Sequence, residues 1–131
     1  MDRATRFAAI QYLYHVMVTH ETVTIDSTTA FMKRCENMRG TPEDVNKLVY
    51  GVIEKSHIIE PCIERHLSPN WRFERLGMVL KAILKLSSFE IIFLKSTDKA
   101  LIINQYLEIA KAFNHKGEVG FLNYIMDNVS L

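Results

Sequence analysis

The sequence predicts an all-α protein of about seven helices packed around one long buried helix. Apolar residues recur at helical spacing along the whole chain, and no segment alternates convincingly with the two-residue period of a strand. The stretch from Phe73 to Leu94 is apolar on most sides, which is typical of a central helix surrounded by others. Because the chain has 131 residues, 48% of them hydrophobic, residues 1–131 are expected to form a single domain.

Capping signals predict three helices in the first half of the chain. The first is expected over Arg3 to Thr19, with Asp2 as its N-terminal cap. The second is expected to begin after Asp26-Ser27 and to end at Arg39-Gly40, because glycine is a common C-terminal signal. The third begins at Thr41-Pro42-Glu43-Asp44, where threonine caps, proline suits the first position and acidic residues suit the helix dipole.

Prolines and polar clusters divide the second half. Pro61 is expected to kink the third helix or restart it, because proline removes a hydrogen-bond donor and crowds the preceding turn. A short segment from Cys62 to Leu67 then leads to a turn at Ser68-Pro69-Asn70. After the long central helix, Ser96-Thr97-Asp98 caps a further helix, and a last one is expected near Glu118 to Val129.

The near-balance of charge restricts the kinds of partner. Sixteen basic and fifteen acidic residues give a formal net charge of +1, which excludes a strongly basic coat for nucleic acid but leaves room for a local patch. Cys35 and Cys62 are too few for a disulfide framework and suit a reducing cytoplasm. Charged residues interrupt the most apolar stretch, and the N-terminus does not resemble a signal peptide. A cytoplasmic protein with no membrane partner is expected.

The sequence contains no pattern typical of an enzyme. The five histidines are scattered, and none has two further ligands at metal-binding spacing. Cys62 and His66 can face one side of a helix, but two ligands do not fill a tetrahedral metal site. There is no glycine-rich phosphate loop, and Ser87-Ser88 lies within a helix rather than on a nucleophile elbow. We therefore expect no catalytic residues, no metal and no cofactor.

Five short patterns carry more information than helix formation requires. The two most specific are Arg3-x-x-Arg6-x-x-Ala9-x-Gln11-x-Leu13-Tyr14 and Ile103-Asn104-x-x-x-Glu108-x-Ala110-Lys111-x-Phe113. The other three are Leu48-Val49-x-Gly51-Val52, Leu84-Lys85-Leu86 followed by Glu90, and Phe121-Leu122-Asn123 with Asp127. In their order and separation, these patterns resemble the NusB family of transcription antitermination factors across essentially the whole chain.

The resemblance implies a fold, an RNA ligand and protein partners. It implies two antiparallel helix bundles and binding of a short single-stranded element, boxA, in ribosomal RNA leaders. It also implies a complex with NusE, the free form of a small-subunit ribosomal protein, that helps RNA polymerase to read through terminators. Some members of the family self-associate over the surface that otherwise meets RNA, so both a monomer and a homodimer stay open here.

Four candidate RNA contacts lie in the first predicted helix. Arg3 and Arg6 are three residues apart, so they share a helix face and can hold a pair of phosphates. Cations at a helix N-terminus oppose the dipole, so helix stability does not explain them. Gln11 can read a base edge or bond a neighbouring helix, and Tyr14 can stack an unpaired base or form the rim of the core.

Two further candidates lie near the last helix. The resemblance places Phe121 at the RNA surface, although its spacing fits a core residue equally well. Lys116, in the preceding loop, either adds a phosphate contact or keeps the loop hydrated. This interpretation requires the first helix and the start of the last one to share a single solvent-facing surface.

The chain departs from the family pattern at several positions. At the face expected to bind NusE, Leu80 and Lys99 replace more typical acidic and aromatic residues, so charge complementarity there must differ. The other departures are a thinned arginine tract, Gly117 for an acidic residue, Tyr124 for a glycine, and Gln105 and Tyr106 for an acid and a small residue. Two alternatives therefore stay open: a helical protein-interaction module that has lost RNA binding, and an RNA-targeting subunit of a separate ribosomal RNA methyltransferase.

Overall fold

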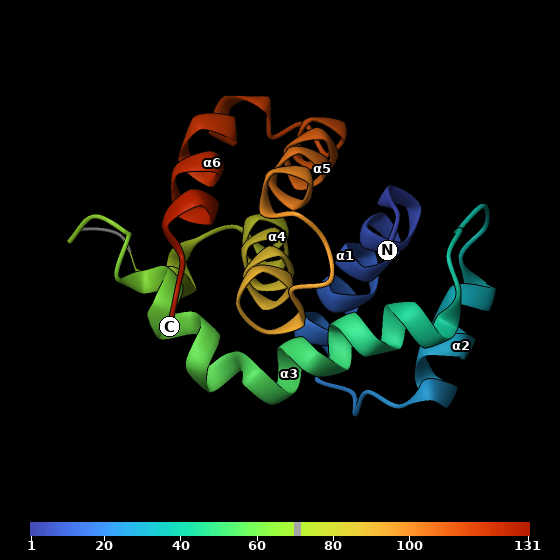
Figure 1. The fold of residues 1–131 in the computed structure, drawn as a ribbon. Coiled ribbons are helices and arrows are strands. Elements are labelled where there is room, and N and C mark those ends of the chain that lie inside the picture. Colours follow the sequence, from blue (N-terminus) through green and yellow to red (C-terminus); the bar gives the residue numbers. More distant parts are fainter. Residues whose placement is uncertain (70–71) are drawn as a thin grey trace.

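The protein is built from helices around a central helix, as the sequence predicts. The computed structural model describes residues 1–69 and 72–131, which contain six α-helices and no strand. They are α1 (Arg3–Thr19), α2 (Ile25–Arg34), α3 (Pro42–Glu64), α4 (Met78–Phe89), α5 (Lys99–Ala112) and α6 (Val119–Asn128). Figure 1 shows α4 in the middle, with α1 and α3 packed on one part of it and α5 and α6 on another. The all-α prediction is confirmed, with six helices rather than about seven.

Local capping explains where the first three helices begin. The Asp2 carboxylate accepts a hydrogen bond from the Thr5 N–H at 2.8 Å, and Thr41 caps α3, so α1 and α3 begin where predicted. The prediction for α2 is wrong at both ends. Thr24 and Ser27 cap each other reciprocally, so α2 begins at Ile25. It ends at Arg34 because the backbone is already extended at residue 35.

The predicted break at Pro61 does not restart a helix. α3 continues through Pro61 to Glu64, so residues 62–67 do not form a separate helix. A single proline removes only one helical hydrogen bond, and the helix around it keeps the rest. This is why residues 1–69 and 72–131 contain fewer helices than expected. Of the predicted turn at Ser68-Pro69-Asn70, Asn70 lies outside the described residues.

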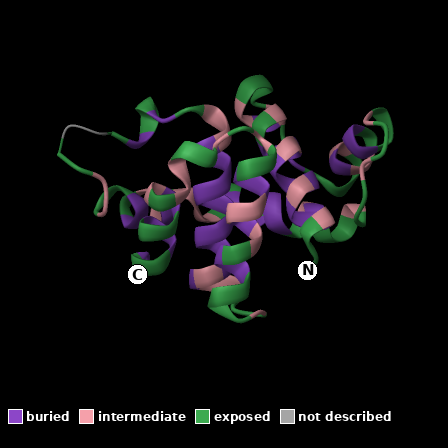
Figure 2. Ribbon diagram, turned by 90° about the horizontal axis from the view of Figure 1, so that it is seen from above, coloured by how far each residue is buried: buried purple, intermediate pink, exposed green. Residues whose placement is uncertain are grey.

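The long central helix predicted from Phe73 to Leu94 consists of three pieces. A short 3₁₀ turn, η1 (Phe73–Arg75), comes first, and extended backbone at Gly77 separates it from α4. A wider π-helical turn, η2 (Glu90–Leu94), follows α4 and ends at Lys95, whose N–H bonds the Glu90 carbonyl at 2.8 Å. Nine of the twelve residues of α4 are buried, so its central place is confirmed. Figure 2 shows buried residues gathered in the middle of the molecule.

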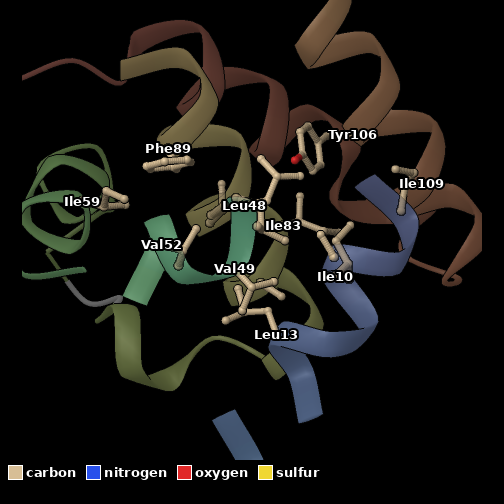
Figure 3. Close-up of a cluster of buried hydrophobic side chains, with 14 of the residues drawn as sticks. Ile10, Leu13, Leu48, Val49, Val52, Ile59, Ile83, Phe89, Tyr106 and Ile109 are labelled. Atoms are coloured by element: carbon tan, nitrogen blue, oxygen red, sulfur yellow. The ribbon is translucent and has the colours of Figure 1, made fainter. Parts of the chain in front are cut away.

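Helices α3 and α4 approach each other closely at one glycine. Leu48, Val49 and Val52 of α3 are fully buried, and Figure 3 shows them in the cluster that also contains Phe89. A Cβ atom added at Gly51 would lie only 2.2 Å from Cζ of the Phe89 ring. Only glycine therefore lets the ring lie against the backbone of α3 at this point. Within the described residues, no helix is both long and apolar enough to cross a membrane.

Replacing Gly51 tests this close approach. In a helix, alanine is more favourable than glycine by about 0.5–1 kcal/mol. Gly51→Ala is nevertheless expected to lower the free energy of unfolding, because overpacking a core costs about 1–3 kcal/mol. Gly120→Ala in α6 is the matched control, since no atom lies within 4 Å of the added Cβ. Urea denaturation of both variants measures the difference. Equal stability of the two variants would show that the Phe89 ring moves aside without cost.

Candidate nucleic-acid interface

One face of α1 is turned to solvent and carries three of the predicted RNA contacts. Residues 3, 7, 11, 14 and 18 follow one another at spacings of three or four, so they form a stripe along the helix. Arg3 is exposed, Gln11 is half-buried and Tyr14 is 43% exposed. The opposite face, with Leu13 and Val16, packs into the core. The structure therefore brings Arg3, Gln11 and Tyr14 onto one accessible surface.

Arg6 lies beside this stripe on the helix but is turned into the core and has no exposed surface. Its Nε and Nη2 atoms donate to the two carboxylate oxygens of Glu90 at 2.9 and 2.8 Å. Its Nη1 atom donates to the carbonyl oxygen of Met1 at 2.9 Å and to the side-chain oxygen of Gln105. All three guanidinium nitrogens thus have protein partners, and no phosphate can reach them. This corrects the prediction that Arg6 contacts RNA.

The geometry of the helix explains the difference between the two arginines. At about 100° per residue, a separation of three residues leaves Arg6 rotated by about 60° from Arg3. That rotation is enough to place Arg3 on the solvent-facing part of the helix and Arg6 on the part that faces the core. Local spacing shows only that the two side chains are neighbours, whereas the position of Glu90, 84 residues away, decides which one turns inward.

Glu90 is the centre of a buried polar cluster. The Tyr106 hydroxyl donates to its carboxylate at 2.5 Å, and the Arg6 guanidinium lies 5.9 Å from the centre of the Tyr106 ring. Burial lowers the pKa of Arg6, but the hydrogen bond and negative charge of Glu90 outweigh this and raise it above its ordinary value. Burial, reinforced by the charge of Glu90, raises the pKa of Tyr106 well above 10.0. The cluster joins α1, η2 and α5.

Phe121 lies in a different groove from the α1 stripe. It is half-buried and lines a groove of about 600 Å³ together with Leu80, Arg75 and Gly117. Arg3 and Gln11 instead line a groove that α1 forms with the α2–α3 connection, residues 35–41. Lys116 is exposed in the short turn η3 (Lys116–Glu118) that precedes α6. The structure therefore brings Phe121 together with Leu80, and not with Arg3 and Gln11.

The two predicted partner-binding residues lie beside opposite ends of α6. Leu80, which is 8% exposed, shares a groove with Phe121 at the N-terminal end of the helix. The Lys99 ammonium donates to the carbonyl oxygen of Asp127 at 2.6 Å, at the C-terminal end. Between them the outer side of α6 exposes Tyr124. In the described part of the chain, no three His, Cys, Asp or Glu side chains are grouped so as to hold a metal ion.

Residues 3–131 match the family model described as the NusB family. A transcription antitermination protein NusB of Bacillus licheniformis is 33% identical over 127 residues, which cover 97% of this chain and 94% of that protein. The chain belongs to the NusB family. A second relative, the NusB protein of Maricaulis maris, is 30% identical over 138 residues, covering 97% of this chain and 84% of that protein.

Solved NusB structures have the same fold. The NusB protein of T. maritima matches with a TM-score of 0.78 at 24% identity, covering 97% of this chain and 89% of that one. A crystal structure of the antitermination factors NusB and NusE in complex with double-stranded RNA matches with a TM-score of 0.80 at 24% identity, covering 95% and 92%. The arrangement of helices described above is therefore that of the NusB family.

Sequence reasoning missed the partners of Arg6. Glu90 stands in an otherwise apolar stretch, and a carboxylate in such a place needs a cationic or hydrogen-bonding partner. That signal was present, but it does not say which of 16 basic residues supplies the charge. The sequence also did not predict that Gln105 and Tyr106 bond to this ion pair, because those contacts depend on how α5 packs against α1 and η2.

The two arginines of α1 are expected to differ in what they do for stability. Arg6→Ala leaves the Glu90 carboxylate buried without its cation, so the free energy of unfolding should fall by about 3–5 kcal/mol. Arg3→Ala removes an exposed side chain and should change it by no more than about 0.5 kcal/mol. Urea denaturation measures both. If the two variants were equally stable, the buried ion pair would not have the structural role assigned to it.

Tyr106 is expected to make stability sensitive to alkaline pH. Above about pH 10 the phenol ionises in the unfolded chain but stays protonated in the folded one, because its folded pKa is raised. The free energy of unfolding should therefore fall with rising pH, by up to about 1.4 kcal/mol per unit for this residue. In Tyr106→Phe the free energy of unfolding should fall less steeply with pH, because this phenol is absent. Denaturation midpoints between about pH 9 and 11 measure the slope, and identical slopes would contradict the assignment.

Proposed function

We propose that this NusB-family chain is a transcription antitermination factor that binds boxA-type single-stranded RNA of ribosomal RNA transcripts together with the ribosomal protein NusE. It works in the cytoplasm within an antitermination complex of RNA polymerase, and it acts by binding rather than by catalysis. The observation that carries the proposal is the family match over residues 3–131, to relatives named as transcription antitermination proteins. The exposed face of α1 supplies suitable chemistry for RNA.

On α1, each exposed side chain has a distinct part in RNA binding. The Arg3 guanidinium holds a phosphate, which sets position without reading sequence. The Gln11 amide offers both a donor and an acceptor to a base edge. Tyr14 provides a flat ring on which an unpaired base stacks. Arg6, buried beneath this face, keeps the start of α1 in place through Glu90 and contributes no direct contact.

A second RNA contact is proposed at Lys116 and Phe121, beside the surface for the protein partner. Leu80 and Lys99 flank α6, and this supports our proposal that the ribosomal protein binds over this helix. Since Phe121 and Arg3 line separate grooves, one RNA strand that reaches both must cross the surface between them. A protein bound beside Phe121 would add contacts there. The pair should therefore bind RNA more tightly than either protein alone.

The direct test is RNA binding measured by fluorescence anisotropy. A labelled boxA-type RNA is titrated with the full chain, with and without the ribosomal protein, at two salt concentrations. Binding that strengthens with the ribosomal protein supports the proposal. Absence of RNA binding in both titrations overturns it. In that case, binding of the ribosomal protein alone would favour a protein-interaction module, the alternative supported by the burial of Arg6.

Two exposed tyrosines make a matched pair for the stacking role. Tyr14 on α1 and Tyr50 on α3 are 43% and 49% exposed, so replacing either should affect folding little. Tyr14→Ala should weaken binding of boxA-type RNA by about 1–3 kcal/mol, the usual contribution of one stacked base. Tyr50→Ala should leave the affinity unchanged. If both variants bound RNA equally, the stacking role of Tyr14 would be wrong.

A further inference from the structure

A groove between α1 and the α2–α3 connection, residues 35–41, has a composition that suits a nucleotide. It encloses about 540 Å³. From α1 come Arg3, Phe7 and Gln11, which supply a cation, an aromatic ring and an amide. From the connection come Met38 and Arg39, which add an apolar side chain and a second cation. The connection was expected to belong to the second helix, so sequence reasoning gave it no role.

The charges around this groove are unlike those of the whole chain. The lining contains Arg3 and Arg39 against the single acid Glu36. Lys33 and Arg34 precede the connection in the sequence, so residues 33–39 carry a net charge of +2 in a protein whose total is +1. Among the ion pairs of the described residues, none involves Arg3 or Arg39. Their charges are therefore not neutralised by a protein partner. Such a local concentration of cations favours a polyanion.

The groove at the C-terminal end of α1 is acidic rather than basic. The groove there, of about 500 Å³, is lined by four glutamates as well as by two lysines. One of these lysines, Lys85, is already paired with Glu60 at 3.0 Å. Phosphates are repelled by such a surface. A strand of RNA that follows α1 is therefore drawn to the N-terminal groove rather than to this one.

The walls of the N-terminal groove are held in place. Gly40 has φ +100°, a conformation that other residues rarely adopt, and an added Cβ would lie 3.0 Å from the Thr5 hydroxyl oxygen. Glycine thus lets the connection lie directly against α1. The Phe7 ring stacks on Phe113 with 4.9 Å between ring centres and 13° between planes. Because both walls are fixed, little order has to be imposed when a ligand binds.

We propose that this groove binds one unpaired nucleotide of single-stranded RNA, with Arg39 as a phosphate contact that acts together with Arg3. The inference rests on the proposed RNA-binding function and extends it to the α2–α3 connection. The base lies against Phe7 and Met38, where Gln11 reads its edge. The flanking phosphates meet the two guanidinium groups at the mouth of the groove. Glu36, the one acid in the lining, opposes binding.

Two variants of opposite sign test the site in the full chain. Arg39→Ala should weaken binding of a short boxA-type single-stranded RNA about three- to tenfold and reduce the slope of log affinity against log salt by about 0.7. Glu36→Gln removes the repelling charge and should tighten binding about twofold. Lys47→Ala, which removes an exposed cation of α3 outside the groove, is the control for net charge and should bind like the unaltered chain.

The outcomes separate this inference from the function on which it rests. If the unaltered chain binds no RNA, with or without the ribosomal protein, the proposed function fails and the site fails with it. If the unaltered chain binds RNA but both groove variants behave like Lys47→Ala, the function stands and the site is overturned. If Arg39→Ala weakens binding of the ribosomal protein and leaves RNA binding unchanged, the groove is a protein-docking site and the inference is also overturned.

Discussion

The ion pair between Arg6 and Glu90 is the constraint on which the arrangement of α1 depends. Removing both charges from water costs several kcal/mol per ion, so the pair is tolerable only with nearly complete hydrogen bonding. The structure provides it: Glu90 accepts from two guanidinium nitrogens and from the Tyr106 hydroxyl, and Gln105 accepts from the third nitrogen. These partners come from three different segments. The pair therefore fixes how α1 is rotated, and with it which residues of α1 face solvent.

Gln105 and Tyr106, two positions where the sequence analysis expects other residues from the resemblance, complete this cluster. An acid at position 105 would place two carboxylates against one guanidinium, so the cluster would carry a net negative charge. Gln105 accepts the same hydrogen bond without adding charge, so one cation and one anion balance. The bulk of Tyr106 fills space where a small residue would leave room, and its hydroxyl donates to Glu90. The two residues therefore work as a set.

Features decided by neighbouring residues were predictable from the sequence, and those decided by distant ones were not. The starts of α1 and α3 follow from caps within a few residues, and both were predicted correctly. The predicted start of α2 was wrong because two capping signals compete and the Thr24–Ser27 pair prevails, and its predicted end was wrong because the backbone is already extended at residue 35. Arg3, Gln11 and Tyr14 share a face because helix periodicity fixes it. The burial of Arg6 was not predictable, because its partner comes from a helix far along the chain.

The distribution of charge along α1 determines what kind of RNA binding this fold supports. With a total charge of +1 and one of the two arginines of α1 buried, few cations are available to displace counterions. Affinity that came only from phosphates would be weak and would fall little with added salt. Stacking on aromatic rings, by contrast, is nearly independent of salt and contributes with every base. For RNA bound as proposed, the aromatic side chains and the protein partner must therefore supply most of the affinity, while the cations mainly set the position of the strand.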